Sequence, residues 1–375
     1  MGQTSIEWTS YRRSDGTIVP GYTFNPIIGC AKKSPGCKFC YAEHDTPARV
    51  ARGQGLELWG VDAARKPASE SYWKQPHAWN RAAQRDGAPR LVFVASQSDW
   101  LEDRPEWEQP RARLLKTVLE TPNLIWLLLS KEPWNFHRLV FNASRDLEPI
   151  DREKSERIDW WANLAQSLRV KRSDDREWLI PNVRLGVSVE NQEWADKRRD
   201  AFAVLPGSKF VSYEPAIGLV DWTGWEFVDQ IISGGESGKD KGIRPSHPDW
   251  HRATRDWCKA NGKAYFFKQW GKWKPFSEMN DAENNSLYRS NKIADRPEDQ
   301  VAVDEVYGRT CKVETSAIGY GGETGTDKAF WTDRYGNDGH SGMQVFGVGK
   351  NASGNFLDGH QHLEIPGINF PLEAE

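Results

Sequence analysis

Six short apolar runs recur along the chain, separated by polar stretches of helical character. The runs cover Leu91–Asp99, Leu124–Glu132, Val183–Asn191, Lys209–Pro215, Gln230–Ser237 and Ala264–Gly271. Continuous apolar runs of this length are typical of strands that are buried on both faces, as in parallel sheets. Because alternating strands and helices indicate βαβ units, the sequence predicts an α/β fold.

Two of the intervening stretches have a helical pattern. They cover residues 104–120 and 247–262, and the second ends at Gly262, as expected of a glycine that follows a helix. A charged stretch, 145–161, is instead interpreted as a surface excursion between two strand–helix units.

Each apolar run ends in polar side chains. These are Ser96 and Asp99, Lys131 and Glu132, Glu190 and Asn191, Glu214, Glu236, and Lys268 and Gln269. In a parallel barrel the carboxyl ends of the strands converge on one mouth, where the chemistry is located. We therefore expect these side chains to share one mouth of a parallel barrel. The alternative is that they are ordinary loop starts.

Three of the five cysteines crowd into one short segment, as Cys30-x6-Cys37-x2-Cys40. Three thiolates can hold three irons of a [4Fe-4S] cluster and leave the fourth iron open to a small molecule. A structural zinc site is the alternative, with His44 as the fourth ligand. Of the remaining thiols, Cys258 is expected to be buried on a helix, and Cys311 is unassigned.

Composition sets further limits. The net charge of −3 gives no overall attraction to nucleic acid, although Ala63–Arg90 mixes basic and aromatic residues and could form a local patch or a solvated face. There are 19 tryptophans, some of which would suit a pocket that stacks on a ring system. The chain shows no long apolar run and no signal peptide at its start, so a cytoplasmic protein with no membrane association is expected.

Changes in composition along the sequence predict three regions. Residues 1–275 are expected to form the barrel, with the metal-binding loop at 29–41. Residues 276–342 are polar and rich in Gly, Asn and Asp, which indicates an irregular insertion or subdomain. Residues 343–375 are expected to pack back on the barrel.

Several segments, taken in order, resemble a known family. They are "TSIEWT", "FNPIIGC", "SPGCKFCYAE", "GVSVENQEWADKR", "SYEPAIG", "GGESG", "RPSHPDW", "FFKQWGKW" and "GVGKNASGNFLDG". The family comprises uncharacterised phage and bacterial proteins often called phage three-Cys-motif proteins. It is similar to a distant branch of the radical S-adenosylmethionine superfamily, with spore photoproduct lyase among its suggested relatives. The resemblance implies the fold of that superfamily, a full or partial parallel (β/α) barrel with the cluster loop after the first strand, here with a polar C-terminal insertion.

Two features depart from that pattern. The usual spacing in the superfamily is C-x3-C-x2-C, whereas the first gap here is six residues. The segment Tyr11–Tyr22 is an insertion that relatives usually lack at this position. We expect it to form a hairpin or loop near the barrel entrance.

The resemblance implies a metal and cofactor site. Cys30, Cys37 and Cys40 would ligate a [4Fe-4S] cluster, and Phe39 would lie against the adenine of S-adenosylmethionine. The remaining candidates are chosen by their positions at the strand ends. Ser96 and Asp99 could hold the methionine amino group, Glu190 and Glu214 the ribose hydroxyls, and Lys131 and Lys268 the methionine carboxylate or an anionic substrate. The glycine-rich pair Gly234 and Gly235 could let the backbone approach the cofactor. Glu214, Glu236 and Lys268 are the expected catalytic groups facing the substrate.

The resulting hypothesis is a radical S-adenosylmethionine enzyme that makes a 5′-deoxyadenosyl radical. Its substrate would be a nucleic acid or nucleobase, for modification or repair, and it would need a reductase and could act with a partner protein encoded in the same operon. Two alternatives stay open. One is a non-enzymatic phage-related binding protein with a Cys3His zinc site, and the other is an iron–sulfur electron carrier or sensor.

Overall fold

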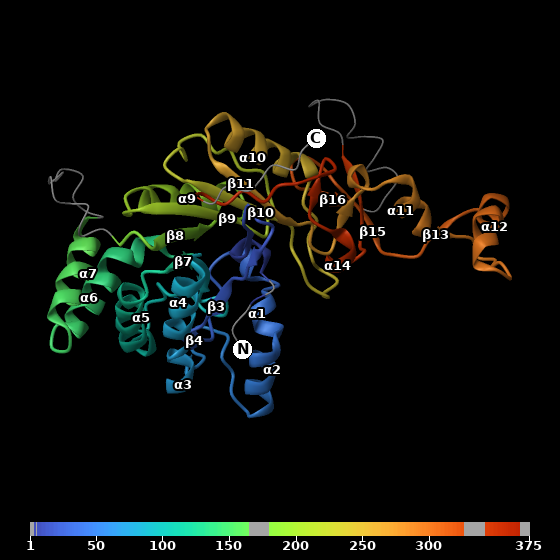
Figure 1. The fold of residues 1–375 in the computed structure, drawn as a ribbon. Helices are drawn as coiled ribbons and strands as arrows, with labels where there is room; N and C mark the ends of the chain where they lie inside the picture. The colour runs from blue at the N-terminus through green and yellow to red at the C-terminus, as the bar shows by residue number, and fades with distance from the viewer. Residues whose placement is uncertain (1–3, 5, 165–179, 326–341, 368–375) are drawn as a thin grey trace.

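The centre of the molecule is a parallel sheet of seven strands, seen in a computed structural model that describes residues 4, 6–164, 180–325 and 342–367. Its strands are β3 (Tyr22–Phe24), β6 (Arg90–Val94), β7 (Leu124–Ser130), β8 (Val183–Ser188), β9 (Ser208–Tyr213), β10 (Gln230–Gly234) and β11 (Ala264–Gln269). They lie side by side in chain order and curl into an open half-barrel (Figure 1). The α/β prediction is confirmed, and each of the six apolar runs contains a strand.

Helices cover the outer face of this sheet. They are α3 (Glu70–Trp73), α4 (Gln75–Asp86), α5 (Glu108–Glu120), α6 (Phe136–Leu147), α7 (Arg152–Leu164), α9 (Gln192–Ala203) and α10 (Pro248–Ala260). Apolar side chains from the strands and helices share one large core that includes Trp126 and Leu185. The two predicted helices are present, and Gly262 takes a φ of +64° directly after the cap of α10.

The stretch 145–161 is not the surface excursion that the sequence predicts. It contains the end of α6 and most of α7, and these two helices pack together. Ile158, Trp161 and Ala162 of α7 are buried in the main core. Charged residues on the solvent side of α7 conceal this apolar side in the sequence.

The inner face of the sheet is covered from both ends of the chain. Trp8 in η1 (Glu7–Thr9) packs against Phe93 and Phe210, and Leu363 forms an antiparallel bridge to Phe266 of β11. The segment around this bridge includes α14 (Lys350–Ser353), β18 (Phe356–Leu357) and β19 (His360–Gln361).

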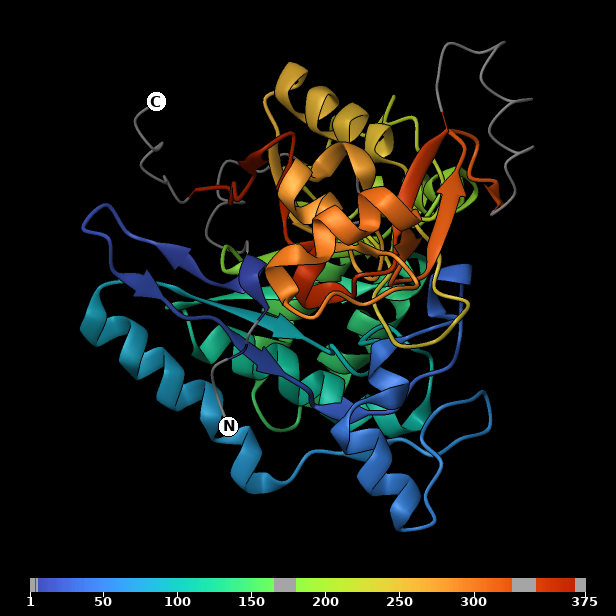
Figure 2. The same ribbon diagram turned by 90° about the vertical axis from the view of Figure 1, so that its right-hand side faces the viewer.

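The inserted segment is a hairpin of β1 (Tyr11–Arg12) and β2 (Ile18–Val19), drawn in dark blue in Figure 2. The Tyr11 hydroxyl donates to the carbonyl of Pro89, immediately before β6 begins. The hairpin therefore lies at the amino end of the sheet, so its expected place near the barrel entrance is wrong.

A second, antiparallel sheet follows the half-barrel. It contains β12 (Lys274–Pro275), β17 (Met343–Phe346), β15 (Thr315–Ile318) and β16 (Thr324–Gly325), in that order. Strand β15 belongs to the predicted insertion and pairs with β17 of the predicted C-terminal region. An arm of α11 (Asp281–Ser286), β13 (Tyr288–Arg289), α12 (Gln300–Tyr307) and β14 (Thr310–Cys311) projects beyond this sheet (Figure 1). Residues 326–341 of the predicted insertion lie outside the described residues.

Candidate functional site

The three clustered cysteines lie on one loop, residues 29–41, here called the cysteine loop. It follows β3 through the short strand β4 (Ile27–Ile28), which pairs with β5 (Lys66–Pro67), and it leads into α1 (Tyr41–His44) and α2 (Thr46–Gly53). Gly29 begins the loop with a φ of +116°, and a Cβ there would lie 2.6 Å from the carbonyl oxygen of Leu58. The position therefore requires glycine.

The cysteine loop crosses the carboxyl edge of the half-barrel. The Ser34 hydroxyl donates to Glu190, beyond the end of β8, over 2.5 Å. The Tyr41 hydroxyl donates to the carbonyl of Ser96, beyond the end of β6, over 2.9 Å. Arg244 donates to the carbonyl of Pro35 over 2.9 Å. The loop is thus in contact with residues that follow strands far apart in the sheet.

All three thiols of the loop are free, and Cys37 is buried. Burial raises the pKa of Cys30 well above its usual value, and the negative charges of Asp99 and Glu102 raise it further. Burial also raises the pKa of Cys40, opposed in part by a hydrogen bond from the Ala42 amide and by the Lys131 ammonium. Cys30 and Cys40 would therefore release protons when they bind a metal.

No group of three or more His, Cys, Asp or Glu side chains within the described ranges is arranged to hold a metal ion. His44, the fourth ligand in the zinc alternative, is exposed at the end of α1. Three free thiols share this one short segment at the carboxyl edge of the sheet, and thiolates are ligands of both iron–sulfur clusters and zinc.

Glu190 is the centre of a buried network of charges. Its side chain has no exposed area, and it pairs with Lys131 and with Arg198, whose Nη1 donates to Oε2 over 2.7 Å. Burial would raise the pKa of Glu190, but the two cations outweigh burial and lower it to about 2. Arg198 also donates to the carbonyls of Lys131 and Ser188, which joins the ends of β7 and β8.

Asp99 joins the ends of β6 and β7. Its carboxylate accepts from the Ser130 hydroxyl over 2.6 Å, from the Leu101 amide and from the Lys131 amide. Ser96 exchanges hydrogen bonds with the side chain of Asn25, beyond the end of β3. Both predicted residues therefore lie at the carboxyl edge and connect neighbouring strand ends.

Glu214 and Lys268, predicted separately, form an ion pair of 2.8 Å across the ends of β9 and β11. Gln269 donates to the other oxygen of Glu214 over 2.9 Å. Gly235 is explained by packing, because a Cβ there would lie 2.1 Å from the Trp270 carbonyl oxygen. Gly234 lies beside Glu214, because a Cβ on Gly234 would be 3.5 Å from Cγ and Cδ of that side chain.

Glu236 is buried and holds Arg244, whose Nε donates to it over 3.0 Å. The same arginine lies 5.7 Å from the centre of the Phe39 ring, and that ring leaves no room for a side chain at Gly242. The segment 239–244 is thus packed against the cysteine loop. Two predicted residues, Phe39 and Glu236, meet at this contact.

Lys131, Lys268 and Gln269, which pair with Glu190 and Glu214, are among the polar strand ends that the sequence predicts. The other partners of the predicted carboxylates, Ser34, Arg198 and Arg244, are not predicted. Two of these partners share a sequence spacing that could have indicated the pairing. Arg198 follows Glu190 by eight residues, and Arg244 follows Glu236 by eight residues.

The remaining candidates are structural. Cys258 is buried on α10, as predicted, and burial raises its pKa to about 12. In the segment Ala63–Arg90, Trp73 and Trp79 are in the core and Arg65 forms a buried ion pair with Glu102. The exposed basic residues of this segment are Lys66, Lys74, Arg81 and Arg85, so the two buried tryptophans add no aromatic surface to them.

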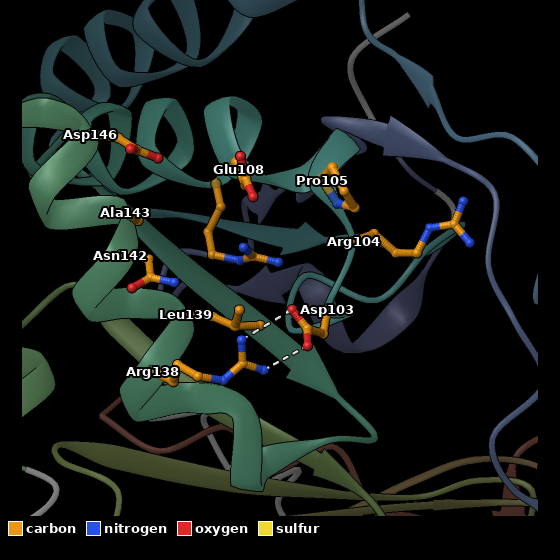
Figure 3. A pocket seen from close by; sticks show the side chains of 10 residues that line it. Asp103, Arg104, Pro105, Glu108, Arg138, Leu139, Asn142, Ala143 and Asp146 are labelled. Carbon is orange, nitrogen blue, oxygen red and sulfur yellow. Dashed lines mark hydrogen bonds and ion pairs between the residues drawn. The ribbon is translucent and has the colours of Figure 1, made fainter.

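A small cavity of about 140 Å³ lies between α5 and α6 (Figure 3). Arg111, Arg138 and Asp103 line it together with other polar residues. The Arg138 guanidinium donates to both oxygens of Asp103, and Arg111 donates to the carbonyls of Trp100 and Glu102. None of the predicted site residues lines this cavity.

The fold and site define a class: an α/β protein with an open parallel half-barrel and a three-cysteine loop across its carboxyl edge. The chain belongs to the family described as protein of unknown function (DUF5131), whose model matches residues 3–366. No curated protein and no solved structure matches the chain. Among the described helices, none combines the length and apolar character needed to cross a bilayer.

Proposed function

We propose that this chain is a radical S-adenosylmethionine enzyme whose cysteine loop holds a [4Fe-4S] cluster. When bound, the cluster would supply the electron that cleaves S-adenosylmethionine into methionine and a 5′-deoxyadenosyl radical. The observation that carries the proposal is the position of the loop. It follows the first strand of a parallel sheet whose strands lie in chain order, and it crosses the edge where all of their carboxyl ends lie.

The chain's own residues would bind and orient the reactants at this edge. Cys30, Cys37 and Cys40 are the proposed ligands. The ion pair of Glu214 with Lys268 places one anion and one cation at the mouth, where they can hold a zwitterionic amino acid group or a polar substrate. Phe39, Ser96, Asp99, Lys131, Gly234 and Gly235 stay predicted contacts of S-adenosylmethionine.

For the substrate we propose a nucleic acid or nucleobase. The support is local charge: Lys38, Lys239 and Lys241 are exposed on the cysteine loop and on the segment packed against it. Phosphate contacts need such lysines, and binding through them weakens as salt rises. A reductase and an operon-encoded partner protein stay predictions.

Iron, sulfide and zinc analysis of anaerobically purified protein tests the cluster. We expect about four irons per chain in the natural protein and a large loss in Cys37→Ala. The control is Cys258→Ala, which removes a thiol outside the loop. Stoichiometric zinc without iron would overturn the proposal in favour of the zinc-binding protein.

Two further measurements test the chemistry and the substrate. Release of 5′-deoxyadenosine under a strong reductant is expected, and iron without this release would favour an electron carrier or sensor. Lys239→Glu with Lys241→Glu should weaken binding of single-stranded DNA and lower its salt dependence, whereas Lys259→Glu on α10 should leave both nearly unchanged. Equal effects of the two charge changes would contradict the proposed contact.

A further inference from the structure

The tip of the cysteine loop, Ser34–Pro35, is held from two sides by buried carboxylates. On one side the Ser34 hydroxyl donates directly to Glu190 over 2.5 Å. The loop backbone also lies against this carboxylate, because a Cβ on Gly36 would be 2.6 Å from Glu190 Cγ. A hydrogen bond to a charged acceptor is among the stronger kinds in proteins.

On the other side the contact runs through Arg244. Its Nη2 donates to the Pro35 carbonyl over 2.9 Å, while its Nε and its backbone amide donate to Glu236. Glu236 is only 4% exposed, so the guanidinium is held at a fixed place and angle. The two carboxylates follow β8 and β10, which are separated by β9, so the tip is attached to two points of the sheet edge.

The tip of the loop also contacts the thiol of Cys37. Ser34 Oγ lies 3.8 Å from Cys37 Sγ, and the Lys33 amide donates to the same sulfur over 3.5 Å. A loop that is fixed at Ser34 therefore also fixes Cys37, which is buried within the same turn, η2 (Pro35–Cys37).

We propose that Glu190 and Glu236 are positioning residues that clamp the tip of the cysteine loop to the edge of the sheet before any metal arrives. Both oxygens of Glu190 are engaged, Oε1 by Ser34 and Lys131 and Oε2 by Arg198, so this carboxylate joins the loop to the ends of the strands. Loss of a group that orients a metal ligand typically lowers metal affinity about 10–100-fold. The identity of the group that the loop binds rests on the proposed function. The way in which the loop is held does not depend on it.

The clamp can be tested on metal-free protein by the rate at which iodoacetamide alkylates each cysteine. Trypsin should release Cys37 in the peptide of residues 34–38 and Cys40 in the following peptide, so mass spectrometry reads the two separately. Because Cys37 is buried, its alkylation requires the loop to open. Dividing each rate by the rate in denaturant removes differences in intrinsic thiol reactivity.

Ser34→Ala removes the direct contact and leaves the ion pairs of Glu190 in place. We expect Cys37 to be alkylated about tenfold faster, as loss of a hydrogen bond to a charged group implies. Ser34→Thr, which keeps the hydroxyl, should restore the slow rate. Arg244→Lys keeps a positive charge near Glu236 but lacks the second guanidinium nitrogen, so it should also accelerate Cys37.

Two controls separate loop opening from general loss of stability. Cys258 is fully buried on α10 and should stay protected in every variant, and the exposed Ser71→Ala should change nothing. Unchanged Cys37 rates in both Ser34→Ala and Arg244→Lys would overturn the clamp, as would equal acceleration of Cys37 and Cys258. If the clamp variants behave as expected but the protein holds zinc and no iron, the clamp stands and the proposed radical chemistry fails.

Discussion

The outer face of the sheet and its carboxyl edge are both buried, but opposite kinds of side chain fill them. The outer face is filled by residues such as Trp126 and Leu185, which are apolar and nearly inaccessible. At the edge the buried side chains include Asp99, Glu190 and Glu236, all at most 4% exposed. Apolar burial stabilises the fold in proportion to area, whereas a buried charge is tolerated only beside well-placed partners. The core therefore supplies stability, and the edge supplies a defined geometry for the loop.

The largest effect is expected from the core. Trp126→Ala should lower the free energy of unfolding by about 3–5 kcal/mol, because it removes a fully buried ring from the centre of the sheet. Denaturant unfolding measures the loss. Trp134→Ala removes a ring that is 49% exposed and should cost far less. Similar losses in the two variants would mean that the outer face is not the main source of stability.

The contrast between the apolar outer face and the polar carboxyl edge also explains how much of the structure can be predicted from the sequence. Continuous apolar runs predict the buried parallel strands, since the signal lies within each run. Strand β3 has only three residues and gives no such run, and the apolar side of α7 is hidden among charges. The polar strand ends were predicted one residue at a time. Their pairing depends on contacts such as Ser34 with Glu190, 156 residues apart, which local pattern does not encode.

The next effect comes from breaking a buried ion pair at the edge. Arg198→Met leaves Glu190 buried with Lys131 as its only cation, and should cost about 3 kcal/mol in the free energy of unfolding. Adding Glu190→Gln removes the stranded charge and should recover part of the loss. A double-mutant cycle measures this coupling. Strictly additive losses would show that the two side chains do not act as a pair.

Lower pH should weaken the edge before it affects the core. The pKa of Glu190 is lowered to about 2 in the folded protein, from about 4.5 in the unfolded chain. Between pH 4.5 and pH 2, Glu190 is therefore protonated in the unfolded chain but ionised in the folded protein. Stability from this group is present above pH 4.5 and is lost as pH falls, by about 2 kcal/mol at pH 3. Unfolding curves of the natural protein and of Glu190→Gln should therefore converge on acidification. A constant difference between them down to pH 3 would contradict a lowered pKa.

The smallest effect is expected where the same chemistry is exposed. Arg138 and Asp103 form a two-fold hydrogen-bonded pair beside the small cavity, with more than half of each side chain accessible (Figure 3). Water and salt screen such a pair, and holding two side chains in one geometry costs entropy, so Arg138→Met should lower the free energy of unfolding by less than about 1 kcal/mol. The loss should shrink further in 0.5 M salt, whereas the loss in Arg198→Met should hardly change. A salt-insensitive loss of about 3 kcal/mol at Arg138 would mean that burial is not what separates the edge network from ordinary surface pairs.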